Sequence, residues 1–345
     1  MAHARLPSVS ARAVGSDTRR LFTAKRLVND RLFQPDMEEM MKRVFERTRR
    51  RVGPLLTAAT LAFLTTAEGS AQPAVTLHHA HGLAYSADGK HLMVPSHHGM
   101  AVYAEGKWSK APGPQHDYMG FAATKTHLYS SGHPAPGSGL RNPFGLVRSK
   151  DGGGRWDTLS LEGESDFHLL ATGWNTNAVY VWNSVLNSRM RQTGLHFTFN
   201  NGFQWQHAAA AGLSGEPRAL AVHPSDAKTL GAATSTGIYV SRDSGASFKP
   251  LAQGEQGLSV FFDLDEKHLW YGSYAGGPRL MRVQLQGGAK TAAALPPLER
   301  DAVAYIAQNP ANTTEYAIAT FERSVYISKD AGKTWNQIAN RGNAK

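Results

Sequence analysis

The chain has 345 residues, of which 41% are hydrophobic and 19% are charged, a composition that supports a sizeable globular core and excludes a largely disordered protein. Its formal charge is +10, but residues 1–71 carry +6 of this, and the remaining +4 is too mild to indicate nucleic-acid binding. The absence of cysteine excludes disulfides, thiolate nucleophiles and cysteine-ligated zinc.

The N-terminal region has the features of a secretory signal. Residues 42–51 are rich in Lys and Arg, residues 55–64 form an apolar run, and residues 69–71 are the small residues of a cleavage site. The apolar run is well short of the ~20 residues that span a bilayer. We therefore expect residues 41–71 to be a cleaved signal peptide. After cleavage we expect no stable membrane span, and we expect the protein to be periplasmic or secreted. Residues 1–40 are expected to be a leader that is either non-native, from a start codon placed too early, or disordered.

A short motif recurs along the rest of the chain. Ser149, Asp151, Gly153 and Trp156 follow the pattern S-x-D-x-G-x-x-W, which returns at Ser241 and Ser328 and, in relaxed form, at Thr198. The successive copies begin 49, 43 and 87 residues apart, and 87 is about two periods, so a degenerate copy is expected at 281–286. A period of about 40–50 residues predicts a β-propeller.

The chemistry of the motif is that of a tight hairpin turn. Asp and Ser oxygens accept the N–H groups of the turn, Gly adopts a positive φ, and the aromatic residue packs between neighbouring blades. The aspartates are therefore predicted to be structural rather than catalytic: Asp151, Asp243 and Asp330.

The remaining pattern predicts an all-β fold with four antiparallel strands in each repeat. In the clearest repeat, strands are expected at 219–222, 229–233, 238–241 and 248–251, with turns between them. Repeats begin near residues 81, 118, 166, 217, 258 and 301, which gives a six-bladed propeller and a single domain over 72–345. We expect residues 75–78 to add an outer strand to the last blade and close the ring.

Histidines gather on one face of the predicted propeller. The segments that lead into each blade's first strand and the turns between its second and third strands share this face, around the central channel. Imidazole suits zinc, copper, iron or nickel, and nearby methionines favour copper, so zinc and copper are the cofactors considered. The alternative is that these histidines are solvated or tie turns together. The candidate metal ligands are His81, His97, His98, His116, His133 and His168.

The same face carries charged residues for a ligand. Arg218 and Tyr274 are expected on it as well. Carboxylates that could perform acid–base catalysis are Asp117, Glu164 and Asp166. Further ligand-binding candidates are His79, Arg189, Arg300, Asp301, Glu322 and Arg323. The remaining histidines fall in strands or outer turns and are predicted to be structural: His91, His127, His196, His207, His223 and His268.

These motifs resemble those of the bacterial Asp-box (BNR-repeat) propellers, a group that includes sialidases, sortilin-type receptors and photosystem assembly factors. The segments 79–83 (HAHGL), 116–121 (HDYMGF), 131–137 (SGHPAPG) and 162–168 (EGESDFH) are more closely similar to an exported bacterial family commonly labelled glycosylhydrolase-like. The resemblance covers about residues 76–340. It implies a propeller whose Asp boxes lie on the outer rim, away from the ligand face.

The resemblance also allows a test of sialidase activity. Sialidases share an Arg triad whose first member lies in an early blade, together with a Tyr nucleophile paired with Glu. This chain has no Arg between Gln72 and Leu140, so blade one cannot supply that residue. The resemblance therefore does not extend to a standard sialidase site.

Three hypotheses for function follow. The first is an exported, non-enzymatic propeller that binds a small ligand, a transition metal or a protein partner on its His-rich face. The second is a glycoside hydrolase that uses carboxylates on that face to cleave a glycan other than a sialidase substrate. The third is a protein assembly scaffold. Convergence of several imidazole nitrogens favours metal, whereas a pair of carboxylates ~5–9.5 Å apart favours hydrolysis.

Overall fold

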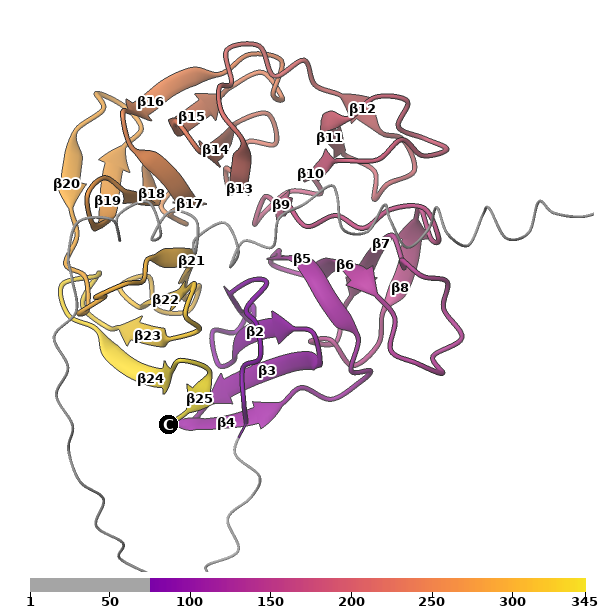
Figure 1. The fold of residues 1–345 in the computed structure, drawn as a ribbon, viewed down its shortest axis with the longest axis horizontal. Coiled ribbons are helices and arrows are strands. Elements are labelled where there is room, and N and C mark those ends of the chain that lie inside the picture. The colour runs from indigo at the N-terminus through magenta and orange to yellow at the C-terminus, as the bar shows by residue number, and fades with distance from the viewer. Residues whose placement is uncertain (1–74) are drawn as a thin grey trace, which may run out of the picture. The chain divides into compact units, whose positions relative to one another are not determined.

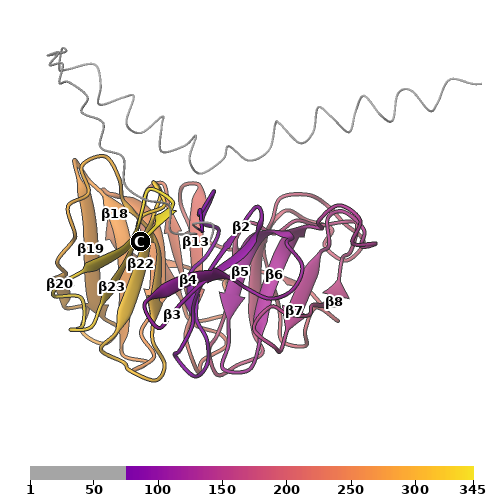
Figure 2. The ribbon, with the colours of Figure 1, turned by 90° about the horizontal axis from the view of Figure 1, so that it is seen from below.

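The computed structural model describes residues 75–345, so the expected leader and signal peptide lie outside the described residues. Within 75–345 the chain forms six antiparallel sheets and no helix. The sheets stand around a common axis in chain order (Figure 1), and Figure 2 shows the ring from its side. This confirms the prediction of an all-β, six-bladed propeller. The described residues contain no helix with the length and apolar character of a membrane span.

Each blade uses consecutive strands. Blades one to three are β1 (Ala84–Tyr85), β2 (Leu92–Ser96), β3 (Gly99–Ala104), β4 (Lys107–Lys110); β5 (Asp117–Ala123), β6 (Leu128–His133), β7 (Leu146–Ser149), β8 (Asp157–Ser160); and β9 (Leu170–Thr172), β10 (Val179–Asn183), β11 (Gly194–Thr198), β12 (Gln206–His207). Blades four to six are β13 (Pro217–Val222), β14 (Leu230–Thr234), β15 (Gly237–Ser241), β16 (Lys249–Gln253); β17 (Gln256–Phe262), β18 (His268–Tyr274), β19 (Pro278–Gln284), β20 (Lys290–Ala292); and β21 (Val303–Gln308), β22 (Tyr316–Thr320), β23 (Val325–Ser328), β24 (Asn336–Asn340), β25 (Asn343–Ala344).

Hydrophobic burial holds neighbouring blades together. Each main cluster of buried side chains draws on two adjacent blades: for example, Tyr180 and Phe197 of blade three pack with Leu230 and Tyr239 of blade four. Neighbouring first strands also contact one another near the axis, as β13 does β17 and β17 does β21. Because the blades are fixed by this apolar packing, loops that are distant in sequence are held on one face.

The repeated motif forms the same turn in four blades. Ser241 Oγ donates to Asp243 Oδ1 (2.7 Å) and accepts the N–H of Gly245 (2.9 Å), whose φ is +83°. Asp243 Oδ1 also accepts the N–H of Ser247 (2.9 Å). The turns that begin at residues 149, 198 and 328 repeat these three hydrogen bonds. Each terminal aromatic residue packs into the core shared with the preceding blade: Trp156, Trp205, Phe248 and Trp335. The aspartates act in turn formation, as the pattern predicts.

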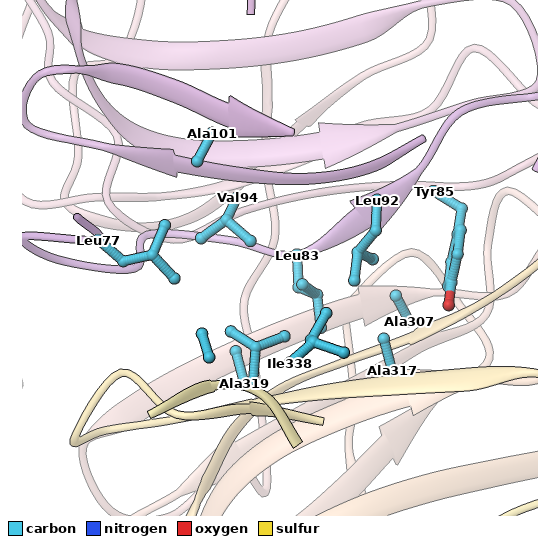
Figure 3. Packing of buried hydrophobic residues seen from close by; sticks show 12 residues of the cluster. Leu77, Leu83, Tyr85, Leu92, Val94, Ala101, Ala307, Ala317, Ala319 and Ile338 are labelled. Carbon is cyan, nitrogen blue, oxygen red and sulfur yellow. The ribbon is translucent and has the colours of Figure 1, made fainter. Parts of the chain in front are cut away.

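The N-terminal end of the described chain closes the ring against the last blade. Thr76 pairs with Asn343 of β25, and Leu77 donates its N–H to Gly342 O (2.7 Å). The Leu77 side chain is buried between blades one and six, where Val94 and Ile338 also lie (Figure 3). Residues 75–77 therefore lie along the last blade, where the sequence places a closing segment.

Candidate metal-binding site

Two segments of blade one bring three histidines together. His79 and His81 lie in the segment that leads into β1, and His97 lies in the turn between β2 and β3. The N–H of His81 donates to Pro95 O (3.0 Å), which fixes one segment against the other. Because His79 and His81 are two residues apart in extended chain, their rings face the same way, and they stack with an interplanar angle of 7°.

The spacing of these imidazoles suits a metal ion. Each of His79, His81 and His97 offers a ring nitrogen, and the three nitrogens all lie within 4.8 Å of one another. Nε2 of His81 is 3.4 Å from Nε2 of His97. Two nitrogen ligands of a tetrahedral zinc ion, each about 2.0–2.1 Å from the metal, are about 3.3–3.4 Å apart. The His81–His97 pair therefore already has the separation of two ligands, and it is long for a hydrogen bond.

Asp117 orients one of the three rings. It begins β5 in blade two, and its Oδ1 is 2.7 Å from Nδ1 of His97. An ionised carboxylate only accepts hydrogen bonds, so Nδ1 of His97 carries the proton and Nε2 carries the lone pair. Ligating histidines in metal proteins commonly donate their second N–H to a carboxylate in this way.

The environment of His81 favours its neutral form. Burial, together with the neighbouring imidazole of His97, lowers the pKa of His81 to about 3, although Asp117 acts in the opposite direction. Neutral imidazole is the form that binds metal, so this ring needs no deprotonation at ordinary pH. His168 also lowers the pKa of His81, although less than the other groups do.

A second polar network lies beside this histidine group, between blades two and three. Asp166 Oδ2 is 3.1 Å from Nε2 of His133 and 2.7 Å from Nε2 of His168. Nδ1 of His133 is in turn 2.6 Å from Asn142 Oδ1. With the amide in this orientation both nitrogens of His133 face acceptor oxygens, which suits an imidazolium ring with two N–H donors. Asn142 was not singled out in the sequence, because its partner lies across a nine-residue turn.

The pKa values in this network follow from the same contacts. The hydrogen bond to Asp166 outweighs burial and raises the pKa of His133 to about 9. Burial alone would raise the pKa of Asp166, but the hydrogen bonds from His133 and His168 dominate and hold it well below its usual value. The network is therefore an ion pair between a carboxylate and an imidazolium, with His168 as a second donor.

Four of the six histidines predicted as metal ligands lie outside the three-histidine group. His98 follows His97 in the same turn but faces His78, with ring centroids 5.2 Å apart. His116 is buried, and its Nδ1 accepts the N–H of Ala135 (2.9 Å) while its ring packs on Phe144. His133 and His168 belong to the neighbouring Asp166 network.

The other predicted ligand-binding residues are dispersed over the same face. Glu164 accepts hydrogen bonds from the backbone and hydroxyl of Ser188 (2.6 and 2.8 Å), and Arg189 donates to Phe203 O (2.8 Å). Asp301 is buried and accepts two backbone N–H groups, one of them from Glu322 (3.0 Å). Two further residues lie near blade six: Arg323, which donates to His78 O (3.0 Å), and Arg300, which lines a 730 Å³ cavity with Asp301 and Arg341.

A second convergence of ligand-type side chains occurs in blade five. Asp263 and Asp265 lie in the turn between β17 and β18, His268 begins β18, and the three place one atom each within 4.8 Å of one another. Arg282 donates to both carboxylates, at 2.7 Å from Asp263 and 3.1 Å from Asp265. The guanidinium fills this group, so it is a closed ion-pair network, and His268 has the structural position that the sequence predicts.

Comparison with known proteins bears on the fold. No protein-family model and no curated protein sequence matches this chain. Among solved structures, the chain is similar to the GH74 enzyme of Niastella koreensis, with a TM-score of 0.53 and 16% identity over 77% of this chain and 46% of that one. It also matches an ancestral GH74 enzyme, with a TM-score of 0.49 and 11% identity over 78% of this chain and 39% of that one. A further match is YCF48 from Cyanidioschyzon merolae, with a TM-score of 0.45 and 14% identity over 79% of this chain and 88% of that one. The chain spans less than half the length of the GH74 enzymes that it matches, and at this identity the likeness shows a shared propeller fold.

Proposed function

We propose that this protein is an exported Asp-box propeller that binds one divalent transition-metal ion, zinc or copper(II), through His79, His81 and His97. The observation that carries the proposal is the 3.4 Å separation of the His81 and His97 Nε2 atoms within a group of three imidazoles. Three protein ligands leave a further coordination position for water or an external ligand. Zinc and copper both accept three imidazole ligands, so measured affinities must separate them.

Asp117 supports the proposal as a positioning residue. Its hydrogen bond to His97 fixes the tautomer that presents Nε2 towards His81. It also supplies one negative charge beside a divalent ion, which offsets part of the charge that three neutral imidazoles leave uncompensated. Burial of His81 keeps that ring neutral and available as a ligand.

Glycan hydrolysis by the same face has weaker support. A glycosidase needs a carboxylic acid with a raised pKa as its general acid. Asp166 is the opposite case, because hydrogen bonds from His133 and His168 lower its pKa, and Asp117 is engaged by His97. The GH74 likeness concerns the propeller fold. Metal binding therefore takes precedence over hydrolysis as the proposed function.

The family and location are part of the same proposal. The Ser–Asp–Gly hydrogen bonds that recur in three turns, and their Thr–Asn–Gly equivalent in a fourth, support assignment to the Asp-box propellers. The basic and apolar pattern of residues 41–71 supports export to the periplasm or beyond the cell. Cysteine-free metal ligation by imidazole suits an oxidising compartment, because imidazole is not lost to oxidation as a thiolate is.

Metal analysis of the purified full chain tests the proposal. We expect one zinc or copper ion per chain by elemental analysis, and titration calorimetry should give the affinity for each metal. His81→Ala should weaken binding by more than about a hundredfold, because removing a ligand costs more than removing its outer-shell partner. His91→Ala is the matched control, since His91 lies on an exposed turn beside Asp88. Absence of stoichiometric metal, or equal affinity in His81→Ala, would show the proposal to be wrong.

A further inference from the structure

Blade three carries most of the exposed apolar side chains of this protein. Within residues 75–345 five large hydrophobic side chains are exposed, and four of them belong to this blade. Val185 (60% exposed) and Leu186 (61%) lie in the loop between β10 and β11. Phe199 (39%) and Phe203 (71%) lie in the hairpin between β11 and β12, the outermost strand of the blade (Figure 1). Single exposed hydrophobic residues are normal on a protein surface, but four in one blade indicate an interaction surface.

The repeated turn motif provides an internal control for the two phenylalanines. All four copies form the same hydrogen bonds, so the turn does not require an aromatic residue at either position. At the position of Phe199 the other copies have a cation: Lys150, Arg242 and Lys329. At the position of Phe203 they have Gly154, Ala246 and Lys333. Blade three also has Asn200 in place of Asp, so its copy is the one among the four that has no charged residue.

The charges of blade three have one predominant sign. Residues 167–215 contain no Asp, Glu or Lys, and apart from histidines their only titratable cations are the exposed Arg189 and Arg191. Nη1 of Arg189 donates to the carbonyl oxygen of Phe203 (2.8 Å), which places a guanidinium beside the most exposed phenylalanine. Glu164 reaches the same loop from the preceding segment and accepts two hydrogen bonds from Ser188. Two arginines against this one carboxylate leave the loop with a net positive charge.

Exposed apolar tips with arginines beside them suit the surface of a lipid bilayer. Phe and Leu side chains enter the boundary between headgroups and acyl chains, while a guanidinium on its long stem stays at the phosphates. Anionic lipids attract each nearby basic residue and repel carboxylates. A protein partner would tolerate carboxylates around the contact, so their absence from residues 167–215 favours lipid. We propose that the β10–β11 loop and the β11–β12 hairpin of blade three dock this propeller onto a bilayer surface that contains anionic phospholipid.

This inference does not rest on the metal site. The docking residues belong to blade three, whereas the three histidines belong to blade one. Vesicle binding is therefore measured in EDTA, and we expect it to be as tight as without the chelator. Binding that disappears in EDTA would mean that a bound metal holds the lipid, and it would overturn the proposal. Failure of vesicle binding in both conditions leaves the metal proposal standing.

The absence of cysteine allows a single fluorescent probe to be placed at the hairpin. In the full chain, Gln204→Cys carries an environment-sensitive nitrobenzoxadiazole label next to Phe203. Ser247→Cys is the matched control, because Ser247 has the equivalent position in the turn of blade four and is likewise exposed. Each protein is titrated with vesicles of equimolar phosphatidylglycerol and phosphatidylcholine. We expect the emission at position 204 to shift to the blue and the emission at 247 to stay constant, which separates docking through blade three from vesicle binding by any other segment.

Variants in the chain labelled at position 204 test the two parts of the surface. Phe203→Ala introduces the residue that blade four has at this position, so the turn should fold normally, and vesicle affinity should fall about tenfold or more. If Phe203→Ala fails to fold, Leu186→Ser serves instead, with a similar expected loss. Arg191→Gln should weaken binding about fivefold at low salt. Arg242→Gln removes an exposed cation from blade four and should leave binding unchanged.

Four results would overturn the proposal. The two probes could respond alike, the variant at position 203 or 186 could bind like the parent, or vesicles of phosphatidylcholine alone could bind as tightly as the anionic ones. The fourth is an emission change at position 204 that depends on protein concentration without vesicles. That result would identify the surface as a contact between two copies of the chain.

Discussion

Two groups of side chains in this propeller converge with the same tightness but with different chemistry. In blade one, ring nitrogens of His79, His81 and His97 converge, and Asp117 contacts the ring of His97. In blade five, Asp263, Asp265 and His268 converge as closely, but Arg282 lies among them. The comparison teaches that convergence of ligand types is not sufficient for a metal site. What separates the two groups is whether a positively charged side chain, such as that of Arg282, already binds the carboxylates.

The two groups also lie at opposite ends of the strands. The blade-five group lies where β17 turns into β18, whereas His79 and His81 lead into β1 and His97 lies in the turn between β2 and β3. Tyr316 of blade six donates to Asp263 Oδ1 (2.9 Å), so the network with Arg282 links two blades. Charged groups join neighbouring blades at both ends, since Asp117 of blade two also contacts His97 of blade one, but the blade-five group includes a guanidinium among its ligand-type side chains.

The largest expected effect on stability comes from removing the guanidinium of Arg282. Arg282→Ala leaves Asp263, which is fully buried, without its counterion, and we expect the free energy of unfolding to fall on the order of 3 kcal/mol at pH 7. Burial already raises the pKa of Asp263, so the loss should shrink as the pH is lowered and this carboxyl is protonated. Denaturant unfolding of parent and variant between pH 4 and 8 measures both effects.

The same variant can break the comparison. If the guanidinium is what excludes a metal, Arg282→Ala should bind a second equivalent of zinc, and calorimetry would detect it. Arg279→Met, on the same strand but exposed, should change the free energy of unfolding by less than about 1 kcal/mol. Unchanged stability in Arg282→Ala would mean that the blade-five network does not hold blades five and six together.

A smaller effect is expected from the carboxylate behind the histidine group. Asp117→Asn keeps the shape of the side chain but removes the charge that fixes the His97 tautomer, and metal affinity should fall about 10- to 100-fold. Glu164→Gln is the control, because it removes a negative charge from the same face and Glu164 hydrogen-bonds Ser188 of blade three. Equal losses in both variants would indicate a general effect of charge on this face rather than positioning of His97.

The smallest effect concerns pH and the His133–Asp166 ion pair. The pKa of His133 is raised from 6.5 to about 9, so its stabilising contribution is complete below about pH 6.5 and is lost as the pH rises through about 9. Asp166 stays ionised throughout this range because its pKa is lowered. The difference in unfolding free energy between parent and His133→Gln should therefore decrease between pH 6 and 10. A difference independent of pH would mean that the imidazolium does not contribute.

The sequence was sufficient to predict the propeller because its evidence is periodic and local. Strands predicted at 219–222, 229–233 and 238–241 agree with β13, β14 and β15 to within two residues, and the motif spacing gives the blade count. The same pattern of strands and turns predicts which face of the propeller carries His79 and His81. Side chains two residues apart in an extended chain point to the same side, so the two rings are expected to lie together.

The make-up of the candidate site could be predicted only in part. Pattern alone could not choose between His97 and His98, because adjacent residues in a tight turn point in different directions and their partners decide which ring meets His81. His116 looked equivalent to them, yet the backbone of Ala135 occupies its Nδ1. The pairings of Asp117 with His97 and of Arg282 with Asp263 join residues 20 and 19 positions apart, and no sequence period encodes such contacts.

The closure of the ring ties the histidine group to the last residues of the chain. Thr76 and Leu77, which are paired with Asn343 and Gly342, immediately precede His79, and Arg323 secures the intervening His78 by its carbonyl. The segment that carries His79 is therefore held on one side by blade one and on the other by blade six, so a substitution that loosens the pairing of Thr76 with Asn343 would reach the histidine group from the far end of the sequence.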